Sequence, residues 1–153
     1  MNIADLVSKD RIVLGVEVAS KKKALEYISE ILSQNQPGVT AGEIFDCLIN
    51  RERLGSTGVG HGIAIPHCRL KGNHATFAML IRLNQGIDYD SIDNQPVDLI
   101  FAMVVPEDAT EEHLKTLAQL ARMFSNTELV DRLHQAEDAE SVYNIMKAGE
   151  PAD

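Results

Sequence analysis

The chain has 153 residues, a formal net charge of -9 and 44% hydrophobic residues. This length suits one folded domain with a sizeable core, so we expect a single domain over residues 1–153. The negative charge disfavours nucleic acid as a main partner, and anionic lipid likewise, because both attract basic surfaces. A protein partner with a basic or apolar docking face remains compatible with this charge.

The expected absence of targeting signals, together with the small number of cysteines, predicts a cytoplasmic protein. Residues 1–5 lack the basic and apolar regions of a signal peptide. No apolar run approaches the ~18 residues that a membrane span needs, so we expect no direct membrane insertion. Cys47 and Cys68 are the only cysteines. They do not form a disulfide framework, and we expect both to be reduced thiols.

The first half of the chain predicts one strand and two helices. Residues 13–18 are rich in β-branched side chains, which is typical of a strand. Ser20 is the expected N-cap of a helix that runs to about residue 34, with apolar residues at helical spacing. Thr40 and Glu43 form a capping-box pattern that predicts a second helix through about residue 53.

The second half predicts buried strands and a third helix. Two apolar runs, residues 77–83 and 97–105, are typical of strands buried on both faces of a sheet. Thr110 is the expected N-cap of the third helix. One face of this helix is apolar and carries Leu114, Leu117, Ala118, Ala121 and Phe124.

The C-terminal segment predicts two shorter helices, near residues 128–133 and 139–147, and a loose tail from Gly149. The chain carries no internal repeat, linker or low-complexity tract. The order of elements therefore predicts an α/β fold with a mixed β-sheet sandwiched by helices.

A glycine-rich segment, residues 55–67 (GSTGVGHGIAIPH), carries the most chemistry. Glycine allows a close backbone approach to an anion, and the hydroxyls of Ser56 and Thr57 are possible donors. The segment is neither a Walker A loop nor a dinucleotide-binding fingerprint, because no Gly-Lys-Ser/Thr follows and a helix precedes it. On the glycines alone, an ordinary surface loop is the favoured interpretation.

His67, directly after Pro66, is the candidate phosphoryl acceptor. Its ordinary pKa of ~6.5 leaves much of the imidazole neutral and nucleophilic at physiological pH. Arg51, near the end of the second helix, can hold two phosphoryl oxygens. His113, in the first turn of the third helix, can hydrogen-bond His67 or a phosphoryl oxygen. Taken singly, each residue also fits a structural or solvated role.

Two rival chemistries are disfavoured by spacing. The possible metal ligands show no zinc pattern, so we expect no metal and no cofactor; they are His61, His67, Cys68, His74 and His113. Cys68 has no catalytic-cysteine signature around it. No carboxylate pair stands out for glycoside chemistry.

Residues 51–58 (RERLGSTG) and 62–67 (GIAIPH) closely resemble the enzyme IIA domains of the fructose/mannitol class. These belong to the bacterial phosphoenolpyruvate-dependent phosphotransferase system. Residues 92–99 (IDNQPVDL) and 113–114 (HL) extend the resemblance, which spans about residues 20–143 and is greatest for the nitrogen-regulatory branch. It implies a mixed sheet sandwiched by helices.

The resemblance implies that His67 accepts a phosphoryl group on Nε2 from a small carrier protein of the HPr/NPr type. It further implies that Arg51 is an active-site arginine, that His113 lies beside the acceptor, and that Ser56 and Thr57 are the hydroxyl pair of the intervening loop.

The resemblance to the nitrogen branch further implies that the phosphorylation state regulates partners such as potassium transporters and sensor kinases. The alternative is a sugar-specific enzyme IIA that passes its phosphoryl group to a separate enzyme IIB. A regulatory binding module without onward transfer, and a metal-binding protein, are further hypotheses.

Two residues depart from the family pattern. His61 stands where the nitrogen branch usually has Asn and the mannitol class has Glu, so we expect a second titratable group near the phosphoryl site. Cys68 stands where Gly is common, which raises the possibility of redox sensitivity.

Overall fold

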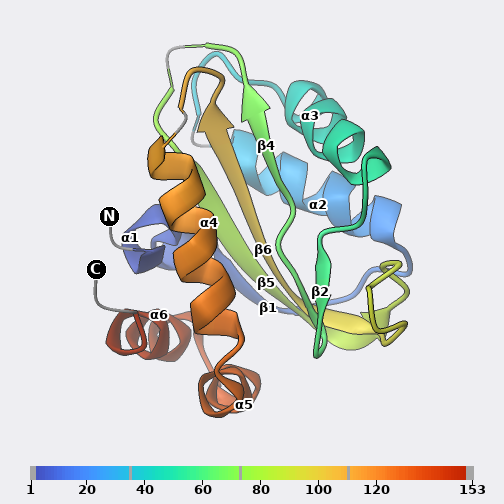
Figure 1. Ribbon diagram of the computed structural model, residues 1–153, viewed down its shortest axis with the longest axis vertical. Coiled ribbons are helices and arrows are strands. Elements are labelled where there is room, and N and C mark those ends of the chain that lie inside the picture. The colour runs from blue at the N-terminus through green and yellow to red at the C-terminus, as the bar shows by residue number, and fades with distance from the viewer. Residues whose placement is uncertain (1–2, 35, 73, 110, 151–153) are drawn as a thin grey trace.

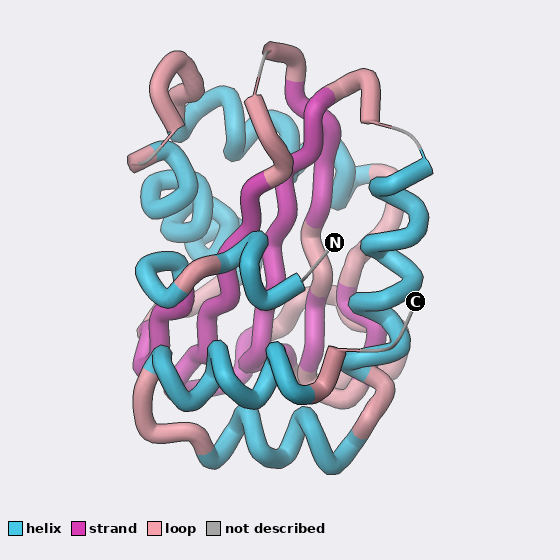
Figure 2. The backbone as a smooth tube through the Cα atoms, turned by 90° about the vertical axis from the view of Figure 1, so that its left-hand side faces the viewer, coloured by secondary structure: helices cyan, strands magenta, loops and turns pink. Residues whose placement is uncertain are grey.

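A computed structural model describes residues 3–34, 36–72, 74–109 and 111–150. In these ranges one β-sheet lies between two layers of helices (Figure 1), and a quarter turn shows the strands side by side, with helices in front of them and behind them (Figure 2). The prediction of an α/β fold with a mixed sheet sandwiched by helices is confirmed. None of the helices in these ranges has the length and hydropathy that crossing a bilayer demands.

The sheet of the described chain mixes parallel and antiparallel pairs. Its strands are β1 (Ile12–Val16), β2 (Gly58–Gly60), β3 (Ile63–Ala64), β4 (His67–Leu70), β5 (Phe77–Ile87) and β6 (Val97–Pro106). The order is β1-β5-β6-β3-β2, and β4 also pairs with β6. The long central strands β5 and β6 are antiparallel, whereas β1 is parallel to β5.

β3 and β4 form one interrupted run along the same side of β6. Both are parallel to β6, and the register continues from Ala64↔Ile100 to His67↔Met103. Ile65 and Pro66 lie between the two strands, and proline has no N–H for a sheet ladder. The interruption therefore falls directly before His67.

The helices divide between the two faces of the sheet. One hydrophobic cluster packs one sheet face against α2 (Lys21–Ser33) and α3 (Ala41–Arg53). A second cluster packs the other face against α1 (Ile3–Val7), α4 (Glu111–Phe124), α5 (Thr127–Gln135) and α6 (Ala139–Ala148). A short 3-10 turn, Lys9–Arg11, leads into β1.

Local capping sets the start of the two helices beside the site, as predicted. Ser20 Oγ accepts a hydrogen bond from Lys23 N at 3.2 Å. Thr40 Oγ1 accepts from Glu43 N at 3.1 Å, while Glu43 Oε1 accepts from Thr40 N at 3.1 Å. Thr110, the expected cap of α4, lies outside the described residues.

The apolar face of α4 is only partly buried. Leu114 is 63% exposed, and Ala118 and Ala121 are also exposed. The buried positions of α4 include His113, Thr116, Leu120, Met123 and Phe124. The polar side chains of His113 and Thr116 are therefore buried, whereas part of the apolar face is exposed. Hydrophobic periodicity alone does not reveal this orientation of the helix.

Short elements and chain ends were missed. The glycine-rich segment contains β2, β3 and the start of β4, and α1 was not predicted at all. These pieces are too short to show a hydrophobic period. The predicted loose tail is wrong at Glu150, whose Oε1 accepts a hydrogen bond from Ala4 N at 2.7 Å; residues 151–153 lie outside the described ranges.

The cysteines form a disulfide between Cys47 in α3 and Cys68 in β4, so the expectation of two reduced thiols is wrong. The cysteines are 21 residues apart in sequence, and their Cα atoms lie 5.8 Å apart. Packing of the helix on the edge strand brings them together, which no local pattern could reveal.

We expect Thr40→Ala to lower the free energy of unfolding by about 1 kcal/mol, because it removes the side-chain acceptor at the start of α3. Urea denaturation measures this loss. Thr40→Ser is the matched control, since it keeps the hydroxyl. Equal stability of Thr40→Ala and the wild-type protein would contradict the prediction.

Candidate functional site

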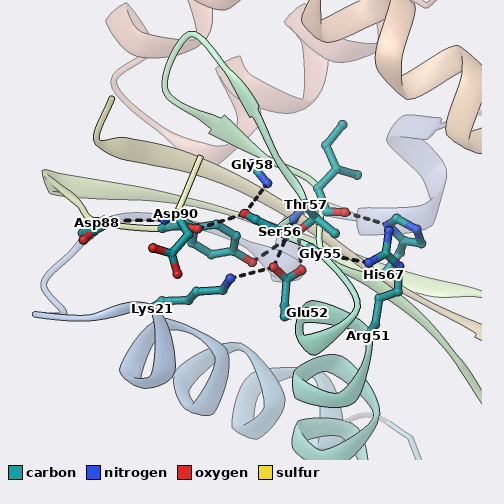
Figure 3. A network of polar contacts seen from close by, with 12 residues as sticks. Lys21, Arg51, Glu52, Gly55, Ser56, Thr57, Gly58, His67, Asp88 and Asp90 are labelled. Carbon is teal, nitrogen blue, oxygen red and sulfur yellow. Dashed lines mark hydrogen bonds and ion pairs between the residues drawn. The ribbon is translucent and has the colours of Figure 1, made fainter. Parts of the chain in front are cut away.

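The interruption at Ile65 and Pro66 sets the conformation of the candidate acceptor. Ile65 N donates to Thr57 O at 3.0 Å, and Met103 N donates to Pro66 O at 2.9 Å. His67 Nδ1 lies 2.7 Å from Ile65 O (Figure 3). A carbonyl oxygen only accepts, so Nδ1 carries the proton. In the neutral ring Nε2 then keeps its lone pair.

The pKa of His67 is lowered from its ordinary value. Burial is the main cause, because it penalises the charged ring, and the positive charge of Arg51 acts in the same direction. The hydrogen bond to Ile65 and the carboxylate of Glu52 act in the opposite direction. The nucleophilic neutral form is therefore favoured over a wider range of pH.

Arg51 lies in the last turn of α3, beside His67 (Figure 3). Its Nη1 donates to Gly55 O at 2.9 Å, which ties the guanidinium to the start of the glycine-rich segment. A guanidinium has five N–H donors, so this bond leaves donors that can hold phosphoryl oxygens.

His113 brings a second imidazole to the acceptor from α4. The ring centroids of His67 and His113 are 5.8 Å apart. His113 is 7% exposed, and its Nδ1 has no hydrogen-bond partner among the described residues. The pKa of His113 is lowered mainly by burial, and the positive charges of His67 and Arg69 lower it further. A buried polar nitrogen of this kind favours a ligand that completes its hydrogen bonding.

His67, Arg51 and His113 line one cleft of ≈ 740 Å³. Its walls come from α3, β4 and α4, and Figure 1 shows β4 between the two helices. The cleft is also lined by Glu43, Asp46, Cys47, Asn50, Leu54, Cys68, Arg69, Leu70, Lys71 and Glu107. The structure thus brings together three of the five predicted site residues.

Two cationic residues of the cleft, Arg69 and Lys71, were missed by sequence reasoning. Side chains alternate along a strand, so Arg69 lies on the same face of β4 as His67. Had residues 67–70 been taken as a strand, this spacing would have shown that Arg69 shares a face with the candidate acceptor.

Ser56 and Thr57 do not line the cleft, and their hydroxyls have partners elsewhere. Ser56 Oγ donates to Tyr89 O at 2.9 Å. Thr57 Oγ1 donates to Glu52 Oε2, and Thr57 N donates to Glu52 Oε1 at 3.1 Å. A role for these hydroxyls toward a phosphoryl group stays a prediction.

A buried carboxylate, Glu52, organises the polar network behind the site (Figure 3). Its side chain is 2% exposed and forms an ion pair with Lys21 Nζ at 2.9 Å. Lys21 Nζ also lies 4.5 Å from the ring centroid of Tyr89. Burial raises the pKa of Tyr89, and Glu52 adds to this. The network joins α2, the end of α3 and the glycine-rich segment, so it holds the turn that carries Arg51.

His61 lies away from the candidate acceptor. It is exposed in the turn between β2 and β3, at φ 57°, where its N donates to Asp93 Oδ2 at 3.0 Å. It does not line the cleft, so the expectation of a titratable group next to the phosphoryl site is not supported. Among the described residues, no group of three His, Cys, Asp or Glu side chains is arranged to hold a metal ion.

Comparison with known families identifies the class of protein. The family model for "Phosphoenolpyruvate-dependent sugar phosphotransferase system, EIIA 2" matches residues 5–149. The chain belongs to this family, whose members are phosphoryl carriers of the phosphotransferase system.

Within the family, the chain is similar to nitrogen regulatory proteins, as its sequence motifs predicted. It is 42% identical over 146 residues to the nitrogen regulatory protein of Pseudomonas aeruginosa and 39% identical over 150 residues to that of Bradyrhizobium diazoefficiens, covering 95% of each chain in both cases. The crystal structure of Nitrogen Regulatory Protein IIA-Ntr from Neisseria meningitidis has a TM-score of 0.90 at 39% identity, over 94% of this chain and 98% of that one.

A more distant structure shares the fold. IIA mannitol from Escherichia coli has a TM-score of 0.75 at 19% identity, and the match covers 91% of this chain and 97% of that chain. The mixed sheet and its helical layers therefore persist where most side chains differ.

We expect Glu52→Ala to lower the free energy of unfolding by about 3 kcal/mol, because it removes the buried partner of Lys21 and Thr57. Glu26→Ala is the matched control. It breaks the exposed pair with Lys23 and should cost less than about 0.5 kcal/mol. Denaturant unfolding of both variants measures the difference, and similar small losses would refute the structural role of Glu52.

We expect the His67 ring to titrate below the ordinary value of ~6.5, since burial and Arg51 both disfavour its charged form. Arg51→Ala should move this pKa upward by removing a nearby positive charge. NMR titration of the imidazole C–H signals, assigned with His67→Ala, measures both values. A midpoint at or above the ordinary value in the wild-type protein would contradict the prediction.

Proposed function

We propose that this protein is a regulatory phosphoryl carrier in which His67 Nε2 accepts a phosphoryl group from an HPr/NPr-type phosphocarrier protein. The observation that carries the proposal is the hydrogen bond from His67 Nδ1 to Ile65 O. It leaves Nε2 as the nucleophilic nitrogen in a cleft that also contains Arg51 and His113.

In the proposed transfer, Nε2 attacks the phosphorus of a phosphohistidine in line with the bond to the donor ring. That phosphorus–nitrogen bond breaks, and its electron pair returns to the donor imidazole. His67 keeps its Nδ1 proton, so its phosphorylated ring is cationic, and the Ile65 carbonyl stabilises this positive charge. The donor is already activated, so the step needs no metal ion.

Arg51 and His113 are the proposed stabilising groups. A phosphoryl group brings roughly -1.5 to -2 charges at neutral pH, which a guanidinium offsets directly. His113 lines the cleft, and an N–H of its imidazole would donate to a phosphoryl oxygen. We keep Ser56 and Thr57 as supporting residues that shape the preceding segment.

The surface around the cleft supports docking of a protein partner. Leu54, in the cleft wall, is 83% exposed, and Leu114, next to His113, is 63% exposed. The exposed face of α4 continues with Ala118 and Ala121. Apolar side chains at the centre of an interface are the usual anchors of protein binding, so the donor can bring its phosphohistidine to His67 here.

Regulation is the output we propose for this carrier. Similarity to several nitrogen regulatory proteins supports it. In this view the protein acts in the cytoplasm, and the phosphorylation state of His67 controls targets such as potassium transporters or sensor kinases. The phosphoryl charge would change the electrostatics of the docking surface and hence partner choice.

A second candidate is a sugar-specific carrier that passes the group to a separate enzyme IIB. The chain is 30% identical to the "PTS system fructose-specific EIIABC component" of Bacillus subtilis, spanning 23% of that protein. The two candidates differ in whether phosphorylated His67 delivers its phosphoryl group to an enzyme IIB.

Intact mass after incubation with phosphoenolpyruvate, enzyme I and an HPr-type carrier tests phosphorylation. We expect one acid-labile phosphoryl group on the wild-type protein and none on His67→Ala, with circular dichroism showing that the variant is folded. His61→Ala is the matched control, because it removes an exposed histidine outside the cleft and should be phosphorylated normally. The proposal would be contradicted if an active donor left the wild-type protein unmodified, or if His67→Ala were fully modified.

A further inference from the structure

The disulfide joins the two elements that carry the proposed phosphoryl site. Cys47 lies in α3, one helical turn before Arg51, and Cys68 directly follows His67 in β4. Both cysteines line the cleft with His67. Their Cα separation of 5.8 Å lies in the usual range for a disulfide.

We propose that Cys47 and Cys68 form a redox-active site for low-molecular-weight disulfides of the glutathione type. The state of this bond sets the rate at which His67 accepts a phosphoryl group. This coupling rests on the proposed phosphoryl function, whereas the thiol chemistry stands on the cysteine pair itself.

Exposure assigns the order of the thiol reactions. Cys47 is partly exposed at the cleft, whereas Cys68 is 6% exposed. The Cys47 thiolate is therefore the group that attacks an incoming disulfide, and Cys68 resolves the product, since exchange requires access to the attacking sulfur.

The exchange balances in two displacements. The Cys47 thiolate attacks one sulfur of the small disulfide, whose S–S bond breaks and releases one small thiolate with the electron pair. The Cys68 thiolate then attacks the Cys47 sulfur and displaces the second small thiolate. The two protein thiols are oxidised, the small disulfide is reduced to two thiols, and these take up the two protons that the cysteines lose. An excess of small thiol reverses the reaction.

The position of the bond explains how it affects phosphoryl transfer. Among the described strands, β4 pairs only with β6, and the residues of β4 line the cleft. The disulfide ties this strand covalently to α3, close to Arg51. Without it, the placement of Arg51 relative to His67 depends on packing of α3 and on the polar network around Glu52, which are not covalent. Preorganised charge at the acceptor speeds transfer, so we expect the oxidised form to be faster.

The test compares two redox states of the whole protein. One sample is oxidised with glutathione disulfide and one is reduced with a phosphine; both reagents are then removed. Thiol titration and intact mass establish the redox state. The initial rate of phosphorylation is then measured with a purified phosphorylated HPr-type carrier that lacks cysteine. We expect the oxidised protein to react at least about threefold faster.

Cys47→Ser is the control variant, because serine replaces a partly exposed cysteine and preserves its size. Its rate should equal that of the reduced wild-type protein after either treatment. If neither redox state accepts a phosphoryl group from an active donor, the proposed function fails. If both states are phosphorylated at the same rate, or the reduced state is faster, only the coupling fails. If glutathione disulfide leaves two free thiols, the redox site itself is refuted.

Discussion

The interruption at Ile65 and Pro66 is the constraint on which the site depends. Pro66 has no N–H to continue the ladder with β6, and Ile65 N donates on the other side to Thr57 O. The Ile65 carbonyl is left to accept from His67 Nδ1. One backbone oxygen thus selects the tautomer of the ring, and it leaves Nε2 as the nitrogen with the free lone pair.

The buried carboxylate of Glu52 supports this arrangement from behind. A buried charge is tolerated only when ion pairs and hydrogen bonds replace its hydration. Lys21 and Thr57 supply them from α2 and from the segment after α3. Because both partners come from outside α3, the network positions the end of this helix. Arg51, one residue before Glu52, therefore reaches the acceptor from a turn that is held on two sides.

Much of the fold could be predicted because its signals are local. The caps at Ser20 and Thr40 depend on contacts with a residue three positions further along the chain. The long apolar runs of β5 and β6 indicate buried strands. The face of α4 could not be predicted in this way. Its apolar stripe at Leu114 is exposed, whereas His113 is buried beside His67, so the geometry of the site overrides hydrophobic patterning there.

The amino-acid sequence by itself determined the family, the main helices and strands, and three residues that meet in one cleft. These properties reside in motifs and contacts between near neighbours in the chain. Only the tertiary structure decided that Cys47 bonds to Cys68, that Ser56 donates to Tyr89 and that Thr57 donates to Glu52. The first two contacts join residues 21 and 33 positions apart. The third needs α3 to end in a turn that buries Glu52. Each partner was set by how the helices pack on the sheet edge, and no residue spacing encodes that packing.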